Sequence, residues 1–192
     1  MKAQYWRVII TSFFMALLTL PLWISALVVV PIALAFSKQE DETLPRWLSW
    51  YDEPTYGING DPYWKGAGYA NGREREYLFR LRWLFRNSLG GWSHDVMGFD
   101  SSRIRSLEWE GDQDTQNKPA GHSGVCYIKV TLDDGSTREC FYIVKQWAAG
   151  RCFRGYFGYK LMDTLHCHLR GEGYGVGQVQ DVFSPNPFMG FK

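Results

Sequence analysis

The chain has 192 residues, enough for one domain but short for two, so we expect a single core. Its 21 basic and 20 acidic residues leave a formal charge of +1, which argues against a general nucleic-acid binder, because phosphate contacts need a surplus of basic side chains. A local basic stripe is left open, and we expect no specific nucleic-acid partner. Aromatic residues make up 17% of the chain, and such rings are favoured where a protein meets lipid headgroups or a partner.

Residues 8–36 form an apolar run of 29 residues without a charged side chain. At a helical rise of about 1.5 Å per residue, this run exceeds the ~30 Å hydrocarbon core of a bilayer and predicts a transmembrane helix. A cleaved signal peptide is the competing interpretation, since Lys2 and Arg7 precede the run and Ala33-Leu34-Ala35 resembles a cleavage site. Signal-peptide cores are usually about 7–15 residues long, so the sequence favours retention as an anchor.

Two prolines lie inside this run, and each removes a helix hydrogen bond. We expect one kinked span. The alternative is a re-entrant hairpin that turns near Pro21, but each arm would be shorter than the ~20 residues needed to cross, and the turn would expose backbone to hydrocarbon. The single span is therefore preferred.

The orientation of the anchor is left open by its flanking charges. Lys2 and Arg7 before the run are matched by Lys38 and Arg46 after it, and Lys and Arg are the residues that set orientation.

The four cysteines give an indirect indication of the compartment. Cys126 and Cys140 flank Asp134-Gly135, a hairpin turn signal. If that pair forms a two-residue loop, Cys126 faces Ile143 and the two sulfurs lie on opposite faces of the sheet, although a bulge would reverse this parity. The pattern favours reduced thiols and a cytoplasmic domain.

Residues 37–72 read as an interfacial and turn-rich linker. Trp47, Trp50 and Tyr51 suit the lipid headgroup zone, and we expect this segment to lie along the membrane surface. The Pro, Gly, Asn and Asp residues that follow predict consecutive turns. Asn59 to Asp61 lacks the ligand spacing and closing Glu of a calcium loop, so no metal site is predicted.

Residues 73–89 predict an amphipathic helix, with apolar residues recurring at intervals of three and four. Its basic residues suggest a helix lying on anionic lipid, and Arg75, Arg80 and Arg82 are the candidate headgroup contacts. The alternative is an ordinary helix whose apolar face packs on the domain and whose arginines are solvated. The expected apolar face consists of Tyr77, Leu78, Leu81, Leu84 and Phe85.

The remainder of the chain alternates strands and turns. The segments 104–109, 125–132, 137–144 and 153–161 are candidate strands, the second and third forming a hairpin with one buried face. The glycine-rich stretch from Gly171 to Gly177 predicts a loop. Its GxGxGxG spacing differs from GxGxxG and no helix pattern follows, so a dinucleotide site is excluded.

Few residues carry catalytic or metal-binding chemistry. A cysteine hydrolase would need Cys126 beside His122 and an orienting carboxylate such as Asp133 or Asp134, and a zinc site would need more ligands than His166-Cys167-His168 can point at one ion. Buried thiols, including Cys152, and surface histidines explain these residues more simply. The sequence therefore assigns no catalytic, metal or cofactor-binding residue.

Several short motifs resemble an uncharacterised family of tailed-phage and prophage proteins with an N-terminal membrane segment. They are Leu44-Pro45-Arg46-Trp47-Leu48, Trp50-Tyr51-Asp52, Gly60-Asp61 with Tyr63-Trp64, Trp83-Leu84-Phe85-Arg86-Asn87, Gly158-Tyr159-Lys160-Leu161 and Phe183-Ser184-Pro185-Asn186-Pro187-Phe188. Ser88 stands where that pattern has a proline. The resemblance implies a phage origin and a small membrane-associated domain, and it transfers no catalytic residue.

Together these features predict an α+β protein with an N-terminal transmembrane helix, a basic amphipathic helix and a small antiparallel β-sheet. The expected segments are a tail at 1–7, the anchor at 8–36, the linker at 37–72 and the domain at 73–192. We expect a non-enzymatic, single-pass protein of the bacterial inner membrane that contacts lipid and phage or host envelope proteins, as a monomer or homo-oligomer. A virion or assembly component is the second interpretation, and a cell-wall or lipid hydrolase the third.

Overall fold

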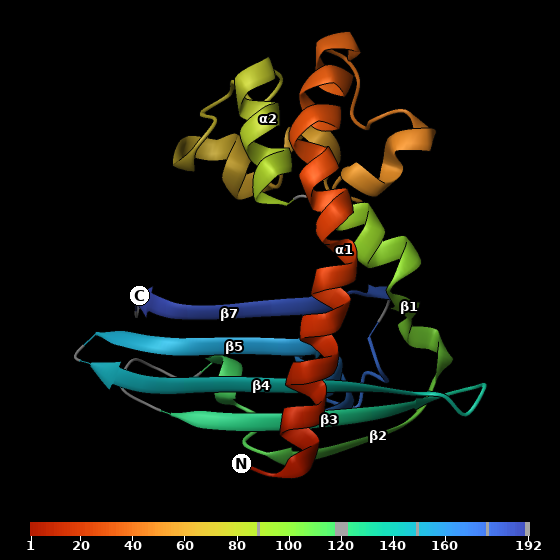
Figure 1. The fold of residues 1–192 in the computed structure, drawn as a ribbon, viewed down its shortest axis with the longest axis vertical. Coiled ribbons are helices and arrows are strands. Elements are labelled where there is room, and N and C mark those ends of the chain that lie inside the picture. Colours follow the sequence, from red (N-terminus) through yellow and green to blue (C-terminus); the bar gives the residue numbers. More distant parts are fainter. Residues whose placement is uncertain (88, 118–122, 149, 176, 191–192) are drawn as a thin grey trace. The chain divides into compact units, whose positions relative to one another are not determined.

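The computed structural model describes residues 1–192 except 88, 118–122, 149, 176 and 191–192. The chain forms two compact units. We call Met1–Leu17 with Gly98–Lys192 the sheet unit, and Leu18–Met97 the helical unit. The fold class is α+β, as predicted, with a long apolar N-terminal helix and antiparallel sheets (Figure 1).

Helix α1 (Ala3–Phe36) gives its first turns to the sheet unit and its later turns to the helical unit. It continues through Pro21 and Pro31, so the hairpin that turns near Pro21 is wrong. Among the described residues, α1 is the one helix long and apolar enough to cross a membrane, a property that core helices of soluble proteins and signal sequences share.

The larger sheet is antiparallel throughout, with strand order β2-β3-β4-β5-β7. Its first four strands form a meander, and β7 adds to the far edge after the helix α3 (Met162–Leu169). The predicted strands are all present. Their bounds are Ile104–Gly111 for β2, Gly124–Leu132 for β3, Thr137–Ala148 for β4, Arg151–Tyr159 for β5 and Asp181–Gly190 for β7, while Phe99–Asp100 (β1) pairs with Gln178–Val179 (β6).

Both faces of the larger sheet are covered, because side chains alternate between its faces along each strand. One face packs on α3, and this core includes Ile128, Tyr142 and Leu165. The other face packs on the first turns of α1, which lie across the strands in Figure 1. That second core consists of Tyr5, Val8, Tyr127, Phe141 and Phe157.

The hairpin of β3 and β4 has a longer loop than predicted. Leu132 donates its N–H to the carbonyl of Ser136 at 2.8 Å, which leaves a three-residue loop that ends at Gly135, where φ is +79°. The extra residue shifts the register by one, so Cys126 faces Tyr142 rather than Ile143. Cys126 and Cys140 therefore share one face of the sheet, and the prediction of opposite faces is wrong. None of the four cysteines forms a disulfide.

The proline-rich C-terminal segment forms β7, an edge strand, where a proline interrupts no central ladder. Phe183 packs back on the core beside α1, with its ring 5.5 Å from that of Phe157. The side chain of Phe188 and all of Phe191, which the sequence places in the same tail, lie outside the described part of the chain.

The core of the helical unit combines the last turns of α1, the segment that follows it and α2 (Tyr77–Arg86). The sequence predicts a linker at 37–72 and a separate domain from residue 73 onward. In the structure, residues 37–97 belong to one compact unit with the later turns of α1. The short helical turns of the chain are Arg46–Tyr51 (η1), Gly57–Asn59 (η2), Trp64–Gly68 (η3), Trp92–Val96 (η4), Ser101–Arg103 (η5) and Thr115–Asn117 (η6).

Helix α2 is confirmed, but it starts later than predicted and buries a different face. Trp83 and Leu84 are buried, whereas Leu78 and Phe85, expected on the apolar face, are exposed. The indole of Trp83 donates to the carbonyl of Gly57 at 2.8 Å. Gly57 has φ +61°, and a Cβ there would lie 2.0 Å from the carbonyl oxygen of Glu42, so this close approach requires glycine.

Candidate functional site

The three aromatic residues predicted at the membrane interface lie on η1. Trp47 is 81% exposed, and Trp50 is partly exposed with its ring 5.0 Å from that of Trp92. Tyr51 is half-buried against the core of the helical unit, and its hydroxyl forms a 2.8 Å hydrogen bond with the hydroxyl of Ser25 on α1. Two large rings are therefore held at the surface of the helical unit by a segment tied to α1.

Two of the predicted basic contacts, Arg75 and Arg82, are exposed in the helical unit. Arg75 donates to the carbonyl of Gln39 at 3.2 Å and lies 3.9 Å from the carboxylate of Glu42. The guanidinium of Arg82 lies over the ring of Phe79, 5.9 Å from its centroid. Both side chains are accessible to a ligand or a lipid headgroup.

Arg80, the third predicted headgroup contact, is not accessible to lipid, because its side chain is buried, at 3% exposure. It donates to the carbonyls of Lys38, Gln39 and Asp41, each at 2.8 Å, and to the side-chain oxygen of Asn59 at 2.9 Å. Burial lowers the pKa of this guanidinium. Arg80 thus satisfies the carbonyl groups that follow the end of α1 and is a structural residue rather than a headgroup contact.

The exposed surface of α1 carries no charged side chain from residue 8 to residue 36 and is mostly apolar. In the sheet unit, Tyr5, Val8 and Ser12 are buried against the sheet, while the opposite side of these turns is exposed. Such a surface is far more apolar than water-exposed helices normally are. Its exposed large residues are Trp6, Ile10, Phe13, Phe14, Leu17, Leu18, Leu20, Trp23, Ile24, Leu27, Val28, Ile32 and Phe36.

An apolar groove of about 660 Å³ lies between the end of α1 and η1 in the helical unit. Its lining includes the partly buried Val29 and the buried Leu48, together with Phe36 and Trp47, which are both strongly exposed. The volume is within the range of roughly 300–1,000 Å³ that is typical of small-molecule sites. The polar side chains at the groove are Ser37, Asp41 and Tyr51.

Asp52, next to η1, is a buried carboxyl group. Its two oxygens accept from the backbone N–H groups of Leu44 at 2.7 Å and Glu53 at 2.8 Å. Burial raises the pKa of Asp52 to about 6, although the two hydrogen bonds oppose this shift. The carboxyl therefore links the segment before η1 to the segment after it, and in the folded protein its charge changes around pH 6.

The first turns of α1 are tied to the sheet by polar contacts as well as by packing. Glu110 on β2 pairs with Lys2 and accepts from the hydroxyl of Tyr5 at 3.0 Å. Glu139 on β4 pairs with Arg7 and accepts from the hydroxyl of Tyr127 at 2.6 Å. The two cations that precede the apolar run are therefore held by carboxylates of the sheet.

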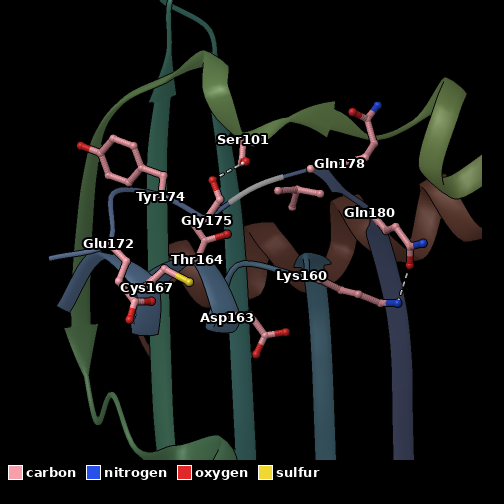
Figure 2. Close-up of a pocket in the computed structure, with 12 residues that line it drawn as sticks. Ser101, Lys160, Asp163, Thr164, Cys167, Glu172, Tyr174, Gly175, Gln178 and Gln180 are labelled. Atoms are coloured by element: carbon pink, nitrogen blue, oxygen red, sulfur yellow. Dashed lines mark hydrogen bonds between the residues drawn. The ribbon is translucent and has the colours of Figure 1, made fainter. Parts of the chain in front are cut away.

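A polar cavity of about 530 Å³ lies in the sheet unit between α3 and the glycine-rich loop (Figure 2). Four glycines of this loop have positive φ, which lets the backbone turn back over α3. Figure 2 shows Lys160, Asp163 and Glu172 around the cavity, with Cys167 on the wall formed by α3. The Nζ of Lys160 donates to the side-chain oxygen of Gln180 at 2.5 Å.

Each charged side chain in the lining of this cavity has a hydrogen-bond partner. Arg170 donates to both oxygens of Glu172, at 2.9 and 2.6 Å, and to the sulfur of Cys167 at 3.4 Å. Asp163 accepts a long hydrogen bond of 3.4 Å from Gln116. The cavity can accept a small polar molecule, and the Cys167 thiol in its lining lies against both Arg170 and Glu172.

The cysteine and histidine candidates do not converge in the described structure. Cys126 is fully buried, and burial raises the pKa of its thiol to about 11, so it is a poor nucleophile. Asp133 and Asp134 instead pair with Arg103 at the hairpin loop. His122 lies outside the described residues, which contain no group of three or more His, Cys, Asp or Glu side chains placed to hold a metal.

Sequence reasoning missed both the polar cavity and the contacts of α1 with the sheet. The second was in principle visible, since Tyr5, Val8 and Ser12 recur at helical intervals. The uniformly apolar run around them hides that pattern. The cavity depends on a long-range approach of Ser101 to Gly175, joined by a 3.1 Å hydrogen bond, which no local motif predicts.

Comparison with known proteins gives one match. The model of a family described as "Family of unknown function (DUF7338)" matches residues 3–192. No curated protein and no solved structure matches the chain.

Proposed function

We propose that this chain, which belongs to the DUF7338 family, is a phage-type protein held in the bacterial inner membrane by α1, where it acts by binding rather than by catalysis. The observation that carries the proposal is the apolar surface of α1. That surface lacks charge from residue 8 to residue 36 and exposes most of its large side chains. Water is a poor environment for so large an apolar area, whereas acyl chains are a good one.

The place of α1 in both cores supports its retention in the mature protein. Tyr5 and Val8 complete the core on one face of the sheet, and Ala26 and Val30 are buried in the helical unit. Cleavage after Ala35, as in a signal peptide, would remove all four side chains and expose the residues they cover. The packing therefore supports an anchor that stays with the mature protein.

The helical unit also exposes side chains outside α1 that are suited to contact a membrane. Trp47 and Trp50 project from η1, and Arg75 and Arg82 are accessible on and before α2. Aromatic and basic side chains together are typical of the headgroup zone of a membrane. We infer that these four residues contact lipid headgroups on the side of the membrane where the domain lies, which we take to be the cytoplasm.

A binding role, for example in altering the host envelope during infection, agrees with the arrangement of the polar groups. The thiols of Cys126, Cys140 and Cys152 are buried away from substrates, and Glu172 at the polar cavity is paired with Arg170. The resemblance to tailed-phage membrane proteins supports a phage origin. Envelope proteins of the host or the phage are the proposed partners.

The test is membrane flotation of the full-length protein expressed in a bacterial host. We expect the protein to float with the membranes and to resist extraction at alkaline pH. Replacing Leu18 and Ile24 with Lys should release it, since placing a Lys among acyl chains costs up to about 2.5–3.5 kcal/mol.

The matched control is Leu78→Lys, which places the same charge at an exposed leucine on α2. This variant should float as the wild type does. Wild-type protein in the soluble fraction would contradict the proposal, and recovery in purified phage particles instead of membranes would support the virion interpretation.

A further inference from the structure

The first turns of α1 pack on a part of the chain that follows α1 in sequence. Tyr5 stacks on Phe141 of β4, and Lys2 and Arg7 pair with carboxylates on β2 and β4. The N-terminal end of α1 must therefore lie on the same side of any membrane as the strands of the sheet unit.

A single crossing, which the sequence predicts for residues 8–36, is incompatible with this packing. If α1 crossed once, residues 1–7 and everything after residue 36 would lie on opposite sides. Tyr5 could then not reach Phe141. A second crossing would restore the contact, but α1 is the one candidate span among the described residues.

We propose that α1 enters one leaflet of the bilayer and does not cross it, so that both of its ends face the same compartment. This inference rests on the proposed membrane association and specifies its geometry. The partner surface is the acyl-chain region of a single leaflet, bounded by its headgroups.

The side chains of the sheet unit fit this geometry. Trp6, Ile10, Phe13 and Leu17 recur at three- and four-residue intervals and form an exposed stripe. Tyr5, Val8 and Ser12 form the buried stripe on the sheet. A helix that lies in the membrane plane normally has a polar face turned away from the acyl chains. In the first turns of α1 the sheet packs on that face instead, so only the exposed stripe is left to contact acyl chains.

The two cations before the apolar run agree with this assignment. Lys2 and Arg7 are engaged by Glu110 and Glu139, so they lie against the sheet and not at the far end of a spanning helix. A leaflet-bound α1 keeps these ion pairs in the headgroup zone or in water. Crossing would require both pairs to separate.

The experiment places single cysteines at the two ends of α1 in the full chain. Cys167, the one cysteine that is not buried, is first replaced by Ser. Ala3→Cys and Glu40→Cys, both at exposed positions, are then labelled in separate variants with a membrane-impermeant maleimide. Each is measured in intact cells, in permeabilised cells and after denaturation, which reports the total thiol.

We expect both cysteines to behave alike, with labelling lost in intact cells and restored on permeabilisation. Labelling of one cysteine in intact cells and of the other only after permeabilisation would show a single crossing and overturn the inference. Flotation of the same samples separates this failure from failure of the proposed function. Protein that does not float refutes membrane association itself, and the leaflet assignment with it.

Discussion

Tyr5 stacks on Phe141 with the ring centroids 4.6 Å apart and the ring planes inclined by 15°. A residue near the start of an apolar helix thereby completes the core of a sheet formed by the C-terminal half of the chain. The contact makes α1 part of the fold of the sheet unit in addition to its proposed role at the membrane.

Tyr5→Ala should destabilise the sheet unit by about 3 kcal/mol, since the change removes a buried aromatic ring and leaves a cavity. The loss is measured by urea unfolding of the full chain in detergent. Trp6→Ala removes a larger ring from the adjacent, exposed position and should change the free energy of unfolding by less than about 1 kcal/mol. Equal effects of the two changes would show that α1 does not pack on the sheet.

Arg80→Gln should destabilise the helical unit by about 3 kcal/mol, because several buried carbonyl groups lose their donor. Arg80→Lys should be intermediate, as an ammonium group cannot reproduce the planar fork of the guanidinium. Arg82→Gln is the matched control and should alter stability by less than about 0.5 kcal/mol.

Variants of the three arginines also distinguish a structural role from a contact with lipid headgroups. Arg75→Gln with Arg82→Gln should weaken binding to anionic vesicles, and this weakening should diminish as salt is added. Stronger loss of vesicle binding in folded Arg80→Gln than in this double variant would contradict the assignment of Arg80 as structural.

The stability of the helical unit should depend on the ionisation of Asp52. Its folded pKa is about 6, above the value of about 4 in the unfolded chain, so the folded state retains the proton over this interval. The contribution of Asp52 to stability is therefore fully present below about pH 4, and about 3 kcal/mol is lost as the pH rises through about 6.

Thermal unfolding at pH 4, 5, 6 and 7 measures this dependence. Asp52→Asn should remove the part of the pH dependence that comes from Asp52. The comparison is made between the two slopes, because other carboxyl groups titrate in both proteins. A wild-type slope that the substitution leaves unchanged would refute the assignment to Asp52.

Only Cys167 should react with a thiol reagent in the native protein, because the other three cysteines are buried. Burial also raises the pKa of the Cys126 and Cys140 thiols, which slows their reaction further. We expect one labelled thiol in native protein and four in urea, counted by mass spectrometry. Labelling of Cys126 in the native state would contradict the sheet packing.

The strands and the amphipathic helix could be predicted because each rests on a local pattern. Alternation along residues 125–132 and 137–144 located the hairpin, but the loop conformation at Gly135 decides its register. One extra loop residue was enough to reverse the face assigned to Cys126. Local alternation does not encode that choice strongly.

The helical unit shows a second limit of local patterns. Arg80 reads as a solvated or lipid-facing cation, and its burial becomes favourable only when three carbonyl groups from the segment after α1 converge on it. The position of Trp83 depends in the same way on Gly57. Such contacts join residues more than twenty positions apart, and no helical periodicity reports them.

The apolar groove beside η1 should hold an acyl chain of a membrane phospholipid. Ile32 and Phe36 belong both to the groove and to the exposed surface of α1, so a groove at the end of an inserted helix opens toward acyl chains. A phospholipid carrying a photoactivatable group on its acyl chain, incorporated into membranes with the full-length protein, should cross-link to the peptide that contains η1.

Val29→Trp should reduce this cross-linking several-fold, because the indole occupies the groove that Val29 lines. Val28→Trp adds the same volume at the neighbouring position, which is 61% exposed and lies outside the groove lining, and should leave the yield unchanged. Both variants should still float with membranes, since neither introduces a charge on α1. Equal cross-linking yields in the two variants would show that the acyl chain contacts α1 generally and that the groove beside η1 has no specific occupant.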